Sequence, residues 1–162
     1  MAISEAALDL ENQSLGANGR PVLGRAYELL RDSWRAGDRD RELALHLMFL
    51  AWYLIIEPAH LTGADPALAS SDELVNMFNQ AHDWLLPAGA ESDDAEALYT
   101  AGLAAHMFSW ALGDHSVWEA RGLSYRVRYR QLAPAGIDPT VFDGRGAYGE
   151  YFARQARVVG GY

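Results

Sequence analysis

The sequence predicts an all-α protein of about six helices. Apolar residues recur at intervals of three and four, proline and glycine interrupt that pattern at helix-length distances, and no segment alternates apolar and polar residues as a β-strand does. With 162 residues, half of them apolar, the chain has the size and composition of one globular domain. We expect one helical domain over residues 20–162, preceded by an N-terminal arm over residues 1–19 that is a short helix or a loose segment.

The first two predicted helices span residues 21–36 and 40–57. Pro21 suits the first turn of a helix, Gly37 ends the first helix, and Pro58 ends the second. The first helix has one apolar face. The second is apolar on every side between Ala44 and Ile56, so we expect it at the centre of the domain.

Four further helices are predicted after a loop at residues 59–70. They run from Ser70 or Ser71 to Pro87, from Ser92 to Leu112, from about 116 to 132, and from about 148 to 158. The serines that precede the third and fourth helices can accept hydrogen bonds from the free N–H groups of the first turn. Acidic residues in those turns favour the positive end of the helix dipole. Residues 144–149, GRGAYG, follow no apolar strand, and we expect them to form a flexible loop.

An internal repeat at an offset of 76 residues is the sharpest pattern in the sequence. Residues 33–38 read SWRAGD and residues 109–114 read SWALGD, with four identities in six positions. Other pairs that the same offset superposes are Ala26 and Gly102, Ala44 and Ala120, Tyr53 and Tyr129, and Pro58 and Pro134. A glycine turn at a fixed point, with a proline 21 residues later, predicts a helical hairpin that occurs twice.

These features resemble the tetratricopeptide-like class of helical-hairpin repeats. The hairpins share a small residue in the first helix, a Gly-Asp turn, an alanine early in the second helix and a closing proline. The distance from the small residue to the turn glycine is 11 residues, about one turn longer than in the standard motif. The resemblance covers residues 24–58 and 100–134, and it implies a scaffold that presents a groove to a partner peptide or protein.

Charge is distributed unevenly along the chain. Residues 42–120 carry 12 acidic residues and no basic one, whereas residues 121–162 carry seven arginines and three acidic residues. We expect the acidic middle and the basic end to face each other, within one chain or between two copies. The overall net charge of −9 argues against a nucleic-acid-binding surface, and the absence of cysteine excludes thiolate-based metal sites.

The sequence predicts a cytoplasmic protein with no membrane partner. The longest apolar run, residues 44–56, falls short of the ~20 residues that span a bilayer. The first ten residues, MAISEAALDL, lack the basic start of a signal or transit peptide.

Two histidines, His46 and His106, are each the only ionisable side chain in the most apolar part of a predicted helix. Such histidines can hold a metal ion between helices, often in Glu-x-x-His motifs. Because that motif does not occur twice on long helices, we expect both side chains to be buried and hydrogen-bonded, without metal, and we predict no cofactor. The dyad His82-Asp83 also occurs in metal phosphohydrolases, but the other ligands of such a site are missing.

The arginine-rich stretch 121–130, RGLSYRVRYR, is the best candidate for a binding site. On a helix, Arg121, Tyr125 and Arg128 can reach a common groove. Guanidinium groups bind carboxylate or phosphate through two parallel hydrogen bonds, and tyrosine adds a flat amphipathic surface. Two interpretations stay open: these residues bind a partner, or they neutralise the acidic middle of their own chain.

We therefore expect a non-catalytic helical-repeat module that binds an acidic or carboxylate-bearing protein or peptide. One alternative is a helical small-molecule or metal-binding protein, which could be an enzyme that uses buried histidines. The other is a structural subunit that assembles into a homo-oligomer.

Overall fold

The computed structural model describes residues 3–69 and 71–158, and that part of the chain is all-helical without β-strands. The α-helices are α1 (Glu5–Gln13), α2 (Leu23–Arg35), α3 (Arg41–Ile56), α4 (Ala59–Thr62), α5 (Pro66–Ala69), α6 (Asp72–Leu85), α7 (Ala95–Phe108), α8 (His115–Leu132) and α9 (Gly146–Val158). Short 3-10 turns are η1 (Gly89–Glu91), η2 (Ser109–Ala111) and η3 (Pro139–Phe142). The all-α prediction is confirmed. The count of about six is too low, because residues 5–13 form a helix and the expected loop at 59–70 contains two single-turn helices.

Most helix starts follow from side-chain capping. Asp40 accepts hydrogen bonds from two backbone N–H groups at the start of α3, and Ser71 accepts one at the start of α6. The fourth predicted helix begins later than expected, because Asp94 rather than Ser92 caps α7. Ser92 instead accepts a hydrogen bond from the N–H of Asp94.

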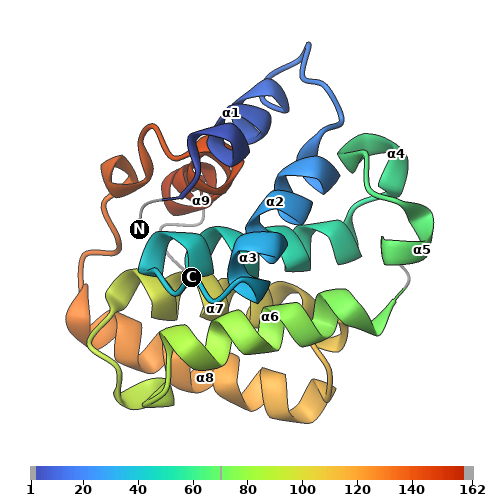
Figure 1. Cartoon of the computed structure of the whole chain (residues 1–162). Coiled ribbons are helices and arrows are strands. Elements are labelled where there is room, and N and C mark those ends of the chain that lie inside the picture. The colour runs from blue at the N-terminus through green and yellow to red at the C-terminus, as the bar shows by residue number, and fades with distance from the viewer. Residues whose placement is uncertain (1–2, 70, 159–162) are drawn as a thin grey trace.

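Helix α3 forms the centre of the core, as its all-round apolarity predicts. Figure 1 shows it crossing the middle of the molecule, with α1, α2 and α9 on one side and α6, α7 and α8 on the other. Residues 43–52 of α3 are all buried. Its most extensive packing is against α6, and α7 packs most extensively against α8.

The two halves of the sequence repeat differ in their surroundings. Gly37 and Gly113 both have positive φ angles, +102° and +129°, as expected of the turn glycine in each motif. However, Trp34 is buried in the core, whereas Trp110 is 62% exposed. The first hairpin, formed by α2 and α3, is also less closely packed than the second, formed by α7 and α8. The reason is that α3 packs mainly on α6 rather than on α2.

A buried charged cluster lies where α1, α3 and α9 meet. Nδ1 of His46 is 2.6 Å from Oε1 of Glu11, and Nε2 is 3.1 Å from Oε1 of Glu42. Burial alone would lower the pKa of His46, but the two carboxylates raise it to about 9. At neutral pH His46 is therefore an imidazolium that donates to both. The expectation that His46 is buried and hydrogen-bonded is confirmed.

Residues near both ends of the described chain form hydrogen bonds and ion pairs with this cluster. The second oxygen of Glu11 accepts a hydrogen bond from the backbone N–H of Tyr148 in the first turn of α9, at 3.2 Å. Arg145 donates to both oxygens of Glu42, and its Nη1 is 2.6 Å from Oε1 of Glu96 on α7. Although burial raises the pKa of Glu42, the hydrogen bonds from His46 and Arg145 lower it to about 2, so Glu42 is ionised at neutral pH.

The expectation of a flexible loop at residues 144–149 is wrong, because Gly146 begins α9. The φ angle of Gly146 is +62°, and a Cβ atom there would lie 2.5 Å from Oε2 of Glu11. Glycine is therefore required for the start of α9 to approach the buried carboxylate.

We expect the free energy of unfolding to decrease as pH rises from about 6.5 to 9. Folding raises the pKa of His46 from 6.5 to about 9, so the stabilisation is complete below the lower value and is lost as pH approaches the upper one. The loss corresponds to about 3 kcal/mol. Because the chain has no lysine or cysteine, few other side chains titrate in this range. Urea unfolding across these pH values measures the slope, and a flat profile would contradict the buried imidazolium.

We also expect Gly146→Ala to destabilise the protein more than Gly144→Ala. Both glycines have positive φ angles, +62° and +74°, so each alanine carries about 1–2 kcal/mol of backbone strain. Only the alanine at 146 also meets Glu11, whereas nothing lies within 4 Å of a Cβ atom at 144. We predict at least about 1 kcal/mol of additional loss at 146 in chemical denaturation. Equal losses would mean that the close approach to Glu11 is absent.

Candidate functional site

Two of the three residues singled out on α8 line one small hollow. Arg121 and Tyr125 face the end of α6 across a space of about 250 Å³, which we call the α6–α8 hollow. Its remaining lining residues are His82, Asp83, Leu86, Pro87 and Gly89.

A hydrogen-bonded relay of three side chains forms one wall of the hollow. Nδ1 of His82 is 2.8 Å from Oδ1 of Asp83, and Nε2 of His82 is 2.8 Å from the hydroxyl of Tyr125. Burial lowers the pKa of His82 below its ordinary value of 6.5, so the imidazole is neutral at pH 7. Because Asp83 only accepts, the ring proton lies on Nδ1, and Nε2 accepts the hydroxyl proton of Tyr125.

Arg121 supplies the positive charge of the hollow. Its guanidinium carbon is 4.6 Å from the centre of the Trp118 ring, in a cation–π contact. This guanidinium makes no hydrogen bond or ion pair with any residue that the structure describes. The hollow therefore contains a half-buried cation whose hydrogen-bond donors are unused.

Arg128 lies outside the hollow, and its guanidinium is bonded to residues of its own chain. Its Nε donates to the backbone carbonyl of Ser92 at 3.0 Å, and its Nη2 pairs with Asp93. The structure therefore brings Arg121 and Tyr125 together and separates Arg128 from them. The ion pair of Arg128 with Asp93 also shows that the basic end and the acidic middle meet within one chain.

The expectation that His106 is buried in the core is wrong, because its side chain is exposed. Helix α7 is buried on all sides from Ala97 to Ala105, but its last turn emerges at the surface. Among residues 3–69 and 71–158, no group of three or more His, Cys, Asp or Glu side chains is arranged to hold a metal ion.

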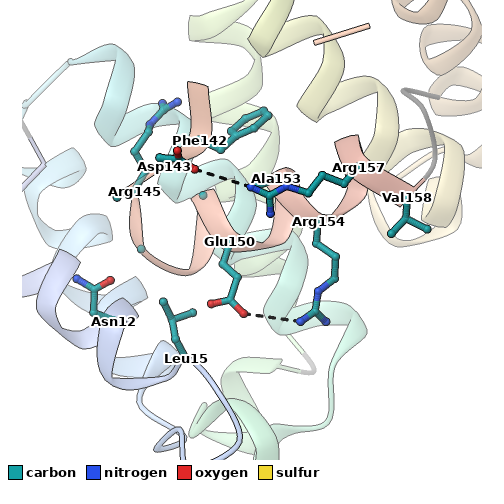
Figure 2. Close-up of a pocket in the computed structure, with 13 residues that line it drawn as sticks. Asn12, Leu15, Phe142, Asp143, Arg145, Glu150, Ala153, Arg154, Arg157 and Val158 are labelled. Atoms are coloured by element: carbon teal, nitrogen blue, oxygen red, sulfur yellow. Dashed lines mark ion pairs between the residues drawn. The ribbon is translucent and has the colours of Figure 1, made fainter. Parts of the chain in front are cut away.

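A larger hollow of about 520 Å³ lies between the end of α1 and α9 (Figure 2). Arg154 lies 3.8 Å from Glu150, and Arg157 lies 4.0 Å from Asp143. The third arginine that lines it, Arg145, is already paired with Glu42 and Glu96. Each of the arginines in this hollow thus has an acidic neighbour, which makes it a weaker candidate than the α6–α8 hollow.

The chain matches no protein-family model, and comparisons with curated proteins and with solved structures find no significant match. The helical fold and the α6–α8 hollow are therefore the basis for a functional assignment. Within the described residues, no helix has the length and apolarity needed to cross a membrane.

We expect Arg128→Ala to lower the free energy of unfolding by about 1 kcal/mol, because it removes a charge-assisted hydrogen bond between α8 and the segment before α7. Arg25→Ala is a matched control, since its partner Glu28 is three residues away on the same exposed helix face. That variant should lose no more than about 0.5 kcal/mol. Equal effects in chemical denaturation would show that Arg128 does not hold the two segments together.

Proposed function

We propose that the protein is a non-catalytic interaction module that binds a carboxylate-bearing peptide or protein at Arg121, and that it acts in the cytoplasm. The observation that carries the proposal is the Arg121 guanidinium, which lines a hollow without an anionic partner among the described residues. Arg128 and Arg145 are engaged by acidic side chains of the same chain. Arg121 is thus better placed than either of these two arginines to meet an external carboxylate.

The surroundings of Arg121 favour binding over catalysis. The contact with Trp118 restricts the guanidinium, which reduces the entropy lost when a carboxylate binds. The Asp83–His82–Tyr125 relay resembles the arrangement that activates a nucleophile. Burial, however, raises the pKa of Tyr125 above its ordinary value of 10, so this hydroxyl is not a nucleophile at neutral pH.

The size of the hollow favours a side-chain-sized anchor on a larger partner. Pockets that enclose a whole drug-sized ligand measure about 300–1,000 Å³, whereas the α6–α8 hollow measures about 250 Å³. We infer that most of the partner lies on the surface around the hollow. Arg121, Tyr125 and the relay would then recognise one carboxylate of a peptide.

The tetratricopeptide-like arrangement is part of the same proposal. It is supported by the glycine turns at Gly37 and Gly113 and by the packing of α7 along α8. The proposed site lies on α8, the second helix of the second hairpin. In this arrangement the helical hairpins provide a scaffold, and the partner is recognised on one face of it.

We expect Arg121→Ala to weaken the binding of an acidic peptide at least tenfold, because a charge-assisted hydrogen bond contributes about 1.5–3 kcal/mol. Isothermal titration calorimetry with a short aspartate-containing peptide measures the affinity. Arg20→Ala is the matched control, since Arg20 is exposed, precedes α2, and its side chain makes no hydrogen bond or ion pair with a described residue. The Arg20→Ala variant should bind the peptide with the same affinity as the natural protein. If no acidic peptide binds, or if Arg121→Ala binds equally well, the proposed function is wrong.

A further inference from the structure

We propose that the group bound in the α6–α8 hollow carries a protonated amine next to its carboxylate, as does the N-terminal residue of a peptide that begins with aspartate or glutamate. This inference rests on the proposed function, because it assumes a carboxylate at Arg121. The hydrogen-bond donors and acceptors of the hollow that other residues leave unused match such a group.

Arg121 is the one unused donor group among the residues that line the hollow. The backbone N–H of Gly89 donates to the carbonyl of Leu86, and the N–H of Leu86 donates to the carbonyl of His82. Pro87 has no N–H. The single hydroxyl proton of Tyr125 is committed to Nε2 of neutral His82.

Two side-chain acceptors of the hollow are left over. The oxygen of Tyr125 keeps lone pairs after its proton is donated to His82. Asp83 uses Oδ1 for Nδ1 of His82, and its Oδ2 takes part in no hydrogen bond or ion pair with a described residue. The side chain of Asp83 is 71% exposed, so a ligand can reach this oxygen. Both acceptors match a ligand that donates hydrogen bonds.

The charges of the hollow lead to the same ligand. With His82 neutral, Arg121 contributes one positive charge and Asp83 one negative charge. A ligand that is only anionic would pair with Arg121, but its repulsion from the Asp83 carboxylate would not be offset by any positive charge of its own. A ligand that is only cationic would leave Arg121 unpaired. A zwitterionic group of amino-acid size pairs with both charges, and the α6–α8 hollow admits a group of that size.

Calorimetric titration at pH 7.5 with three short peptides of otherwise identical sequence tests the inference. The first begins with aspartate and has a free amine, the second is its N-acetylated form, and the third begins with asparagine and has a free amine. We expect the first peptide to bind at least tenfold more tightly than either of the others. Free aspartic acid is titrated in parallel to learn whether an amino acid alone is sufficient for binding. If it binds, and if its binding depends on both Asp83 and Arg121, the inference is supported.

Asp83→Asn provides the matching protein variant. Asparagine retains a side-chain oxygen that can accept from Nδ1 of His82, and position 83 is exposed, so we expect the fold to be preserved. The variant should bind the free-amine and acetylated aspartate peptides equally, while Arg121→Ala still weakens both. Suppose instead that the natural protein binds both peptides equally and in an Arg121-dependent way. The inference would then be overturned and the proposed function would stand. If none of the peptides binds, the proposed function itself fails.

Discussion

The fold depends on one buried imidazolium, His46, which lies between the carboxylates of Glu11 and Glu42. Glu11 is the only buried acidic side chain among the described residues, and it also contacts the first turn of α9. Removing one partner of such a cluster would leave an uncompensated buried charge, which commonly destabilises a protein by about 3–5 kcal/mol. Through this cluster the first and last helices are joined to α3, although they are separated by more than 130 residues of sequence.

The uneven charge of the chain is explained by the same packing. Arg145 from the basic end reaches Glu42 and Glu96 of the acidic middle, and Arg128 reaches Asp93. These ion pairs are formed within one chain, so they do not require a second copy. Once they are formed, Arg121 on α8 is left with a cation–π contact and no ion pair among the described residues. The proposed site is therefore built around an arginine that these internal ion pairs do not engage.

The sequence predicted local features well and tertiary contacts poorly. The central position of α3 follows from its apolarity, and the ends of α2 and α3 follow from Gly37 and Pro58, because these signals are local. The role of Glu11 could not be predicted, since an acidic residue in an N-terminal segment resembles any solvated side chain. His46 and His106 gave the same apolar signal, yet only tertiary packing decides which one is covered. The relay joins His82 to Tyr125, 43 residues away, and no spacing along the chain indicates that α6 lies beside α8 at that point.

The protonation state of His46 tests this account most directly. Nitrogen NMR of the imidazole ring distinguishes a doubly protonated ring from either neutral tautomer, and a His46→Gln variant or selective labelling assigns the signal. The account predicts that both ring nitrogens carry protons at pH 7 and that the ring titrates near the raised pKa of about 9. A ring that is neutral at pH 7, or that titrates near the ordinary value of 6.5, would show that the carboxylates of Glu11 and Glu42 do not hold a buried imidazolium and would contradict the account.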